Sequence, residues 1–392
     1  MNLLYISVLA SQDVISYVQK HNSKFSNFAV HKFNRLVVEG MVHNGQNVTA
    51  LSTFYQPSKG FFWYHHSERI HGVKYKYIPT LNYGLFRHSW LVVYCFCYVL
   101  FWGILHKETK ALMCDVLNIS ACMGAVAAAR LIGLKRVGIM TDMPGLMVER
   151  SHQSISDSIK AFNAKMNKSF LGHFSHYVFL TEQMNKAVNI NHRPYIVMEG
   201  LVGRAMMVPE KTDRNSKRII LYAGGLHERY GLRILVEGFM KANVENSELW
   251  LYGSGPFVYE LPNYSNQDSR IKYKGICSNE EVVEAELRAT LLVNPRPSHE
   301  EFTQYSFPSK NLEYMVSGTP VLTTILPGMP KEYYPYVYLF DKGETTEGYA
   351  EVIQKTLSLP IEQLVAKGAE AKQWVLSNKS YVRQTARIIE IL

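Results

Sequence analysis

The feature of this sequence that most constrains its fold is a recurring alternation of short apolar runs with longer amphipathic stretches. The runs are rich in β-branched residues and are apolar almost throughout, as in "RIILYAGG" and "TLLVNPRP". Strands of this kind, separated by helices, are typical of parallel sheets that are covered by helices on both faces. The sequence therefore predicts a doubly wound α/β fold.

The predicted strands form two series. The first consists of residues 3–7, 48–52, 111–119, 136–142, 177–181 and 195–200, and the second of residues 218–225, 248–255, 271–275, 290–297, 320–324 and 337–340. The chain has 392 residues, which is more than a single hydrophobic core usually accommodates. Two series in a chain of this length predict two domains, and the polar stretch 209–218 is the best linker between them.

Positive charge is concentrated in the N-terminal half. Residues 1–200 contain 20 Lys and Arg against 10 Asp and Glu, whereas the remainder contains 22 against 23. Such a cationic surface suits a membrane face, a nucleic acid or an anionic substrate, although the same bias can simply keep the chain soluble. No nucleic-acid recognition motif accompanies the charge, so we expect no nucleic-acid partner.

One apolar segment raises the question of membrane contact. Residues 90–105, "WLVVYCFCYVLFWGIL", carry no charge, but the segment is shorter than the roughly 20 residues that span a bilayer. We expect a helix that is either buried in the protein or lies in the plane of a membrane with its aromatic residues inserted. The histidine- and aromatic-rich segment 61–77 would suit the same anionic surface.

The N-terminus and the cysteines favour a cytoplasmic protein. The first residues, "MNLLYISVLASQDV", have no cationic leader and predict a strand rather than a signal peptide. The five cysteines have no metal-ligand spacing and lie mostly within apolar runs, as reduced, buried thiols do. We therefore predict a cytoplasmic location, either free or peripheral on the inner face of the plasma membrane.

Two predicted strands of the second series end in glycines. These are Gly224 and Gly225 in "ILYAGG", and Gly253 in "LWLYGSGP". Ligands in open α/β sheets bind at the carboxyl ends of the strands, and glycine lets backbone N–H groups approach an anion closely. Glycine-rich turns can also serve geometry alone, so each is a weak signal by itself.

The stretch "YSFPSKNLEYMVSGTP", residues 305–320, carries the strongest chemical signal. A helix is expected to begin at Pro308 or Ser309, and its free N–H donors attract phosphate. Lys310 adds a full positive charge in the first turn, and Glu313 lies on the same face. A diphosphate at the helix start with a ribose held by Glu313 would explain both side chains, and a plain Lys310–Glu313 surface pair is the alternative.

Together with "YAGGLHERYG" (222–231) and "GTPVLTTILPGMPKEY" (318–333), this stretch resembles the family 4 glycosyltransferases, which have the GT-B fold. Weaker similarity occurs at residues 31–52, 137–145 and 196–202. The resemblance is greatest to bacterial members that build surface polysaccharides such as capsule and lipopolysaccharide. It implies two Rossmann-like domains facing a cleft. It also implies retaining transfer of a hexose from a UDP- or GDP-sugar without a metal or other cofactor, and the absence of any D-x-D sequence agrees with a metal-free site.

The resemblance also assigns site residues. Ser309 and Lys310 would meet the diphosphate, and Glu313 matches the last glutamate of the family's E-x7-E motif, which binds ribose. The first glutamate of that motif falls on Tyr305, so its role passes to Glu300 or Glu301 or is absent.

The family's usual Arg and Lys after the first strand of the C-terminal domain fall on Gly225 and Tyr230. We take Arg229 as the replacement for one of these cations, with Lys310 compensating for the other. In the family's front-face mechanism these cations neutralise the leaving diphosphate while the acceptor attacks from the same side.

Asp142 is our candidate for a catalytic group from the N-terminal half. It ends a predicted strand just before a proline, and a carboxylate at that edge could accept the acceptor's proton or stabilise positive charge on the donor sugar. Capping a helix is the alternative role. The loop 19–33, with Lys24, Ser26 and Asn27, is expected to line the acceptor side or to be plain surface.

The family pattern also predicts the domain limits and the acceptor. The C-terminal helix would return to the first domain, giving an N-terminal acceptor domain of residues 1–208 plus 376–392 and a C-terminal donor domain of residues 209–375. A saccharide acceptor linked to a lipid diphosphate would explain the basic half and the aromatic segments together. A non-hydrolysing sugar-nucleotide epimerase and a non-catalytic nucleotide-sugar-binding subunit are the alternatives.

Overall fold

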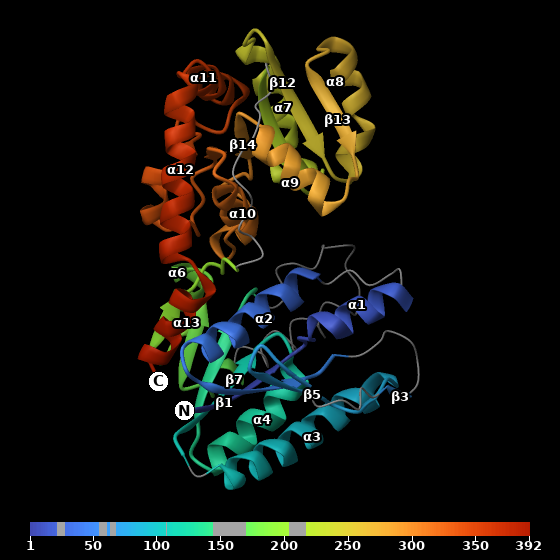
Figure 1. Cartoon of the computed structure of the whole chain (residues 1–392), viewed down its shortest axis with the longest axis vertical. Coiled ribbons are helices and arrows are strands. Elements are labelled where there is room, and N and C mark those ends of the chain that lie inside the picture. The colour runs from blue at the N-terminus through green and yellow to red at the C-terminus, as the bar shows by residue number, and fades with distance from the viewer. Residues whose placement is uncertain (22–27, 55–60, 63–67, 107, 144–169, 204–216) are drawn as a thin grey trace. The chain divides into compact units, whose positions relative to one another are not determined.

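The computed structural model describes residues 1–21, 28–54, 61–62, 68–106, 108–143, 170–203 and 217–392, which divide into two compact units (Figure 1). Met1–Leu201 and Tyr381–Leu392 form the N-terminal unit, and Val202–Ser380 form the C-terminal unit. The sequence had placed this division at 208/209 and 375/376. Most of the expected linker, residues 209–218, lies outside the described residues. Lys24, Ser26 and Asn27 also lie outside them.

The N-terminal unit contains an eight-stranded sheet with the order β10-β9-β8-β7-β1-β2-β5-β4. All neighbouring strands are parallel except β4 and β5. The strands are β1 (Asn2–Ser7), β2 (Asn47–Ser52), β4 (Glu68–Ile70), β5 (Val73–Tyr77), β7 (Lys110–Asp115), β8 (Lys135–Met140), β9 (His176–Phe179) and β10 (Tyr195–Val197). A separate antiparallel pair consists of β3 (Phe61–Phe62) and β6 (Thr80–Leu81).

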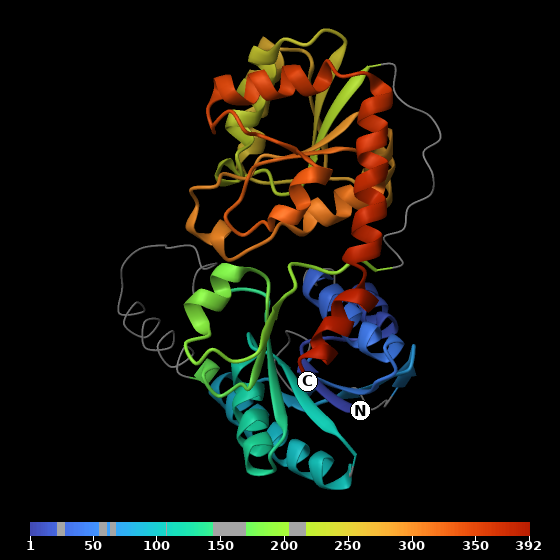
Figure 2. The ribbon, with the colours of Figure 1, turned by 90° about the vertical axis from the view of Figure 1, so that its left-hand side faces the viewer.

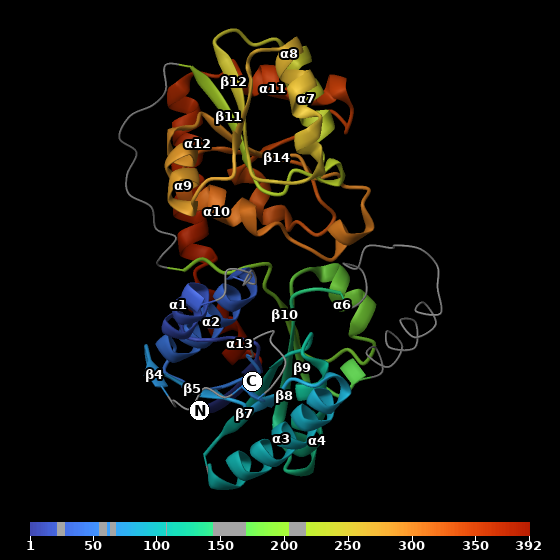
Figure 3. The same cartoon turned by 90° about the vertical axis from the view of Figure 1, so that its right-hand side faces the viewer.

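Helices cover both faces of this sheet (Figure 3). They are α1 (Gln12–His21), α2 (Phe28–His43), α3 (Gly84–Leu105), α4 (Ile119–Leu131), α6 (Glu182–Val188) and α13 (Tyr381–Glu390). On one face α1, α2 and α13 share a buried core with alternate residues of β1, including Leu3 and Tyr5. On the other face α4 packs on β7 and β8, and α3 packs along α4. Both faces of the strands are therefore buried, as their continuous apolar sequences require.

The C-terminal unit contains a six-stranded parallel sheet with the order β13-β12-β11-β14-β15-β16. The strands are β11 (Arg218–Ala223), β12 (Ser247–Tyr252), β13 (Ile271–Gly275), β14 (Leu291–Asn294), β15 (Val321–Thr323) and β16 (Tyr338–Leu339). The helices are α7 (Leu232–Ala242), α8 (Leu261–Gln267), α9 (Asn279–Arg288), α10 (Ser309–Ser317), α11 (Thr346–Leu357) and α12 (Ile361–Asn378). One core joins the sheet to α7, α8 and α11, and a second joins its other face to α9, α10 and α12.

Every strand predicted from the sequence is present, but four further strands within the described residues were missed. The most informative of these is β5, "VKYKY", in which lysines alternate with buried residues. Val73, Tyr75 and Tyr77 of this strand belong to the hydrophobic core. The prediction that segment 61–77 faces a membrane with its aromatic residues is therefore wrong for these two tyrosines, which are buried in the protein.

Helix α3 is longer than the uncharged segment that predicted it, because it continues upstream through Arg87 and His88 to Gly84. Among the described residues it alone has a window, Phe86–Leu105, that is long and apolar enough to cross a membrane. Only 28% of that window is buried in the protein. The backbone of α4 approaches α3 closely, since a Cβ on Gly124 would lie 2.0 Å from the Val92 carbonyl oxygen. The helix is thus held firmly on one side and leaves the other side exposed.

The last helix, α13, packs on α2 within the N-terminal unit (Figure 2). The contact is close at Gly40, where a Cβ would lie 2.5 Å from Thr385 Oγ1 and 2.6 Å from the Tyr381 carbonyl oxygen. The Asn44 side-chain amide also donates hydrogen bonds to the Val382 carbonyl at 2.8 Å and to Thr385 Oγ1 at 3.0 Å. The end of the chain is therefore an integral part of the first unit.

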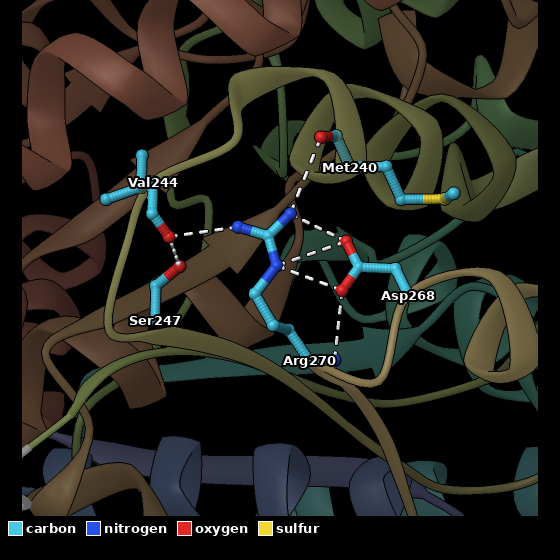
Figure 4. Close-up of polar contacts among 5 residues, drawn as sticks. All are labelled: Met240, Val244, Ser247, Asp268 and Arg270. Carbon is cyan, nitrogen blue, oxygen red and sulfur yellow. Dashed lines mark hydrogen bonds and ion pairs between the residues drawn. The ribbon is translucent and has the colours of Figure 1, made fainter.

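Arg270 connects two loops at the amino-terminal edge of the second sheet (Figure 4). Arg270, just before β13, pairs with Asp268 at 2.6 Å and donates to the Val244 carbonyl, just after α7, at 2.9 Å. Its guanidinium also lies 4.9 Å from the centre of the Phe239 ring. These contacts position the loops at the edge of the sheet opposite to the carboxyl ends of the strands.

Candidate functional site

Helix α10 is fixed to the carboxyl-terminal edge of the second sheet by buried polar contacts. The Tyr314 hydroxyl accepts a hydrogen bond from the Ala223 N–H at 3.0 Å and lies 3.2 Å from the Ala223 carbonyl, at the end of β11. Asn311 accepts a hydrogen bond from the Asn294 amide at 2.7 Å, at the end of β14, and donates to Thr323 Oγ1 at the end of β15. Three strand ends thus hold the first turns of α10 in place.

The start of α10 is as the sequence predicted. Its first residue is Ser309, and the preceding N-cap residue, Pro308, has no side-chain cap for the free N–H donors of the first turn. The helix ends at Gly318, which has a positive φ of 74°. Ser309 is exposed. A helix start without a side-chain cap retains its capacity to bind an anion.

A cavity of about 310 Å³ lies beside this helix start. It is lined by residues from the ends of β11 and β14, the segment after β11, and α10, namely Tyr222, Gly224, Gly225, His227, Tyr230, Asn294, Arg296, Lys310 and Tyr314. Three of the predicted site residues, Gly224, Gly225 and Lys310, therefore come together. This position at the carboxyl ends of parallel strands is the one that ligands occupy in open α/β sheets.

Arg296 is the arginine of this cavity, and the sequence analysis did not identify it as a site residue. Its Nε atom is buried without a hydrogen-bond partner, and it forms no ion pair with a carboxylate in the described parts of the chain. Burial lowers the pKa of the guanidinium, and Arg229 lowers it further, but arginine remains charged at neutral pH. A buried cation without a counter-ion is costly unless an anion joins it. Its place directly after β14 was the available signal.

Arg229, in contrast, faces a neighbouring cavity of about 440 Å³ that is also lined by Glu228 and Glu300. The two arginines share an aromatic pair: the Arg229 guanidinium lies 4.9 Å from the Phe302 ring centre, and that of Arg296 lies 5.2 Å from the Tyr230 ring centre. Like Arg296, Arg229 has a buried Nε without a partner. The structure thus brings Arg296, rather than Arg229, into one cavity with Lys310.

Glu313 forms a loose ion pair with Lys310, with 3.8 Å between Oε2 and Nζ, and both side chains are partly exposed. A second carboxyl group, that of Glu286, lies close by on α9. Burial raises the pKa of Glu286 to about 7, although Lys310 opposes the shift, and Glu313 raises it further. The predicted surface pair is therefore present, but it lies beside a buried carboxyl group, and its Lys310 also lines the cavity.

The remaining predicted residues of this unit lie outside the cavity. Gly253 has a φ of 124°, and a Cβ there would lie 1.9 Å from the Gly224 carbonyl oxygen. Close packing of the two backbone segments therefore requires glycine at this position. Glu301 is exposed in the loop before α10. That loop is anchored by Glu344, which accepts hydrogen bonds from the Ser298 N–H at 2.9 and 3.0 Å.

In the N-terminal unit Asp142 lies two residues beyond the end of β8, at the carboxyl edge of the sheet. Its Oδ1 accepts a hydrogen bond from the Met143 N–H at 2.8 Å. Burial raises the pKa of Asp142, and this hydrogen bond lowers it. At the same edge the sequence analysis missed Asp115, whose pKa burial raises to about 6, because the predicted strand ran past it. Among the residues that the structure describes, no group of three His, Cys, Asp or Glu side chains could hold a metal ion.

Comparison with solved structures defines the class of fold. Sucrose-phosphate synthase from Thermosynechococcus elongatus is 13% identical with a TM-score of 0.65, over 100% of this chain and 98% of that one. The lipopolysaccharide outer core galactosyltransferase WaaB is 13% identical with a TM-score of 0.62, over 100% and 99%. HepE from Anabaena, in complex with UDP-glucose, is 12% identical with a TM-score of 0.61, over 100% and 98%. The chain has the GT-B fold, so the predicted fold class is confirmed.

The sequence comparisons point in the same direction. Residues 217–358 match the family model described as "Glycosyl transferases group 1", and this range lies entirely within the C-terminal unit. A search of curated protein sequences gave no significant match. The family match and the shared fold together support glycosyl transfer as the activity of this protein.

Proposed function

We propose that this protein is a retaining glycosyltransferase that uses a nucleoside diphosphate sugar, with the diphosphate bound in the cavity beside Lys310 and Arg296. The observation that carries the proposal is the convergence of these two cations on the uncapped start of α10 and on Gly224 and Gly225. Cations, N–H donors and glycines in one cavity form an anion site. It lies within the range that matches the glycosyltransferase model.

The chemistry requires stabilisation of the leaving group. As the bond between the sugar's anomeric carbon and the diphosphate breaks, negative charge grows on the phosphate oxygen. Lys310, Arg296 and the helix start are fixed before that charge develops, which is the most effective form of electrostatic stabilisation. Arg229 acts from the neighbouring cavity, and Glu313 accepts hydrogen bonds from the ribose hydroxyls.

Front-face attack by the acceptor hydroxyl on the same side of the sugar would retain the anomeric configuration. We propose that Asp142 accepts the acceptor's proton or stabilises positive charge on the sugar, and its raised pKa makes it a stronger base. Glu301, or Glu300 beside it, is our candidate for contact with the donor sugar. Asp142→Asn and Glu301→Gln test these two roles. Each substitution should lower turnover without loss of donor binding.

For the donor and acceptor we propose a UDP- or GDP-hexose and a saccharide linked to a lipid diphosphate, in the synthesis of a cell-surface polysaccharide. Three observations support this choice. HepE was solved with UDP-glucose, and WaaB is described as a lipopolysaccharide outer core galactosyltransferase. The basic N-terminal half, with 20 Lys and Arg against 10 Asp and Glu in residues 1–200, suits an anionic acceptor or membrane.

The test is a panel of UDP- and GDP-sugars, with release of nucleoside diphosphate followed by mass spectrometry and the product's anomeric configuration determined by NMR. Lys310→Gln should lower turnover at least tenfold, because a charge-assisted contact contributes about 1.5–3 kcal/mol. Lys355→Gln, an exposed helical lysine on α11, is the matched control and should not change it.

The same panel separates the alternatives. An epimerase would convert the donor sugar with no acceptor present. A non-catalytic subunit would bind donors but would neither transfer nor slowly hydrolyse them. Either result would overturn the proposal.

A further inference from the structure

A third cavity, of about 560 Å³, lies in the N-terminal unit between the β2–β5 side of the sheet and the C-terminal half of α3. It is lined by Asn47, Thr49, Arg69, Lys74, Lys76, Tyr98, Phe101, Trp102, Leu105 and His106. The end of α3 lies at the amino-terminal edge of the sheet, since Lys110 at the start of β7 donates hydrogen bonds to the Gly103 and His106 carbonyls. The cavity is therefore at the opposite edge from Asp142 and is no part of the proposed catalytic site.

One wall of this cavity is strongly cationic. Arg69 stands beside Lys74 in the β4–β5 pairing, and Lys76 follows two residues later on the same face. None of the three forms an ion pair with a carboxylate in the described parts of the chain, and no Asp or Glu lines the cavity. Burial lowers the pKa of Lys76, and the neighbouring Lys74 lowers it further. Like charges held together without a counter-ion favour an anionic ligand.

A buried hydrogen-bond donor stands in the same cavity. Trp102 is only 5% exposed, and its Nε1 atom has no hydrogen-bond partner among the described residues. Buried indole N–H groups usually have a partner. An anion in the cavity would supply one, and this observation is independent of the charges on β4 and β5.

The opposite wall continues into an exposed apolar surface. Phe101 and Leu105 line the cavity and are 68% and 76% exposed, and Ile104 beside them is 69% exposed. Val93, two turns earlier on α3, extends this surface. Within the described parts of the unit α3 packs mainly on α4 and also contacts β6, and this surface remains exposed there. Apolar patches rimmed by cations on soluble proteins are typical of membrane contact.

We propose that this cavity binds the phosphate head group of an anionic phospholipid in a bilayer. Arg69, Lys74, Lys76 and the Trp102 N–H contact the phosphate. Phe101, Ile104 and Leu105 enter the adjacent acyl region, with α3 in the plane of the interface. The charge complementarity selects an anionic bilayer over a neutral one, because juxtamembrane Lys and Arg are attracted only by anionic lipids.

The test is flotation of the full chain with phosphatidylglycerol/phosphatidylcholine vesicles and with pure phosphatidylcholine vesicles. The wild type should bind the anionic vesicles only. Lys74→Gln/Lys76→Gln should weaken partitioning about 25-fold, and Phe101→Ser/Leu105→Ser should weaken it comparably. Lys74→Arg/Lys76→Arg should retain binding. Lys272→Gln/Lys274→Gln is the matched control, since it removes two lysines with the same spacing from β13, and should change partitioning less than twofold.

Failure of the wild type to bind anionic vesicles, or equal losses in the two Lys→Gln pairs, would overturn the proposal. Concentration-dependent dimers abolished by Phe101→Ser/Leu105→Ser would instead assign the surface to a second copy of the chain. Binding of free inorganic phosphate without vesicle binding would assign the cavity to a soluble anion. A thermal shift of each variant with UDP reports on folding and donor binding separately, so the result is independent of the proposed transferase activity.

Discussion

At the scale of single residues, the proposed donor cavity combines two cations: Lys310, whose ion pair with Glu313 is loose and partly exposed, and Arg296, which has no carboxylate partner among the described residues. Lys310 could be identified from the sequence because it stands in the first turn of a helix that has a visible start and stop. Arg296 was not identified, because its place after a predicted strand is only a weak signal. Its significance lies in its burial and in its unpartnered Nε, and both follow from the way β14 and the segment after β11 come together. Arg229 was chosen for its position in the chain, and the side chain faces the neighbouring cavity.

Glu286 gives this region a pH dependence of stability. Its pKa is raised by burial to about 7 in the folded protein, from an ordinary value of 4.5. The folded state therefore keeps a proton that the unfolded state releases, and the free energy of unfolding falls as the pH rises from about 4.5 to about 7. The shift corresponds to at most about 3 kcal/mol.

Glu286→Gln should remove this dependence, because the amide has the same shape and stays neutral. Urea unfolding at pH 5 should give the wild type and the variant similar stabilities, whereas at pH 8 the variant should be more stable by up to about 3 kcal/mol. A difference between the two proteins that is independent of pH would show that the buried carboxyl group does not titrate in this range.

At the scale of elements, the strands could be predicted because apolar runs between turn residues specify them locally. Of the four strands that were missed, β5 alternates lysines with buried residues over a short length and lacks a continuous apolar run. The extent of α3 was underestimated because the prediction rested on the uncharged run 90–105, whereas an exposed helix start tolerates charges such as that of Arg87. Which face of α3 is covered could not be predicted, because it depends on the close approach of Gly124 on α4.

The hydrogen bonds between Tyr314 of α10 and Ala223 of β11 predict that one substitution lowers both the stability of the protein and its affinity for nucleoside diphosphates. Tyr314→Phe leaves the Ala223 N–H without its acceptor, which should cost about 1–2 kcal/mol in the free energy of unfolding. Because Lys310 in the first turn of the helix lines the proposed donor cavity, nucleoside diphosphate affinity should fall several-fold as well. Chemical unfolding and calorimetry measure the two effects, and unchanged affinity in the destabilised variant would separate the helix start from the site.

A substitution of Arg270, at the opposite edge of the same sheet, should lower stability without lowering affinity. Arg270→Met removes the contacts with Asp268 and the Val244 carbonyl (Figure 4) and should cost about 2–4 kcal/mol in the free energy of unfolding. Nucleoside diphosphate affinity should not change below the unfolding transition. Weaker binding by the folded variant would show that this edge influences the donor cavity.

At the scale of the whole molecule, two doubly wound units could be expected from two series of strands. Their limits could not be located from composition alone. The observed division falls at 201/202 and 380/381, because α13 completes the core of the N-terminal unit by packing against Gly40 and Asn44 of α2.

Deletion of Tyr381–Leu392 should therefore destabilise the N-terminal unit selectively. Thermal unfolding of the truncated chain should show an early transition that UDP does not shift, followed by a later one that UDP raises, since the cavity beside Lys310 lies in the other unit. A single unchanged transition would contradict the packing of α13 on α2.

The most direct test of the central claim is calorimetric titration of UDP and of uridine into the wild type and into Lys310→Gln/Arg296→Gln. Uridine lacks the diphosphate and should bind both proteins equally. UDP should bind the double variant at least a hundredfold more weakly, because two charge-assisted contacts to phosphate are lost. GDP is titrated in the same way, as the other proposed donor nucleotide. If the folded double variant bound both UDP and GDP as tightly as the wild type does, the diphosphate would not lie in this cavity, and the proposed donor site would be wrong.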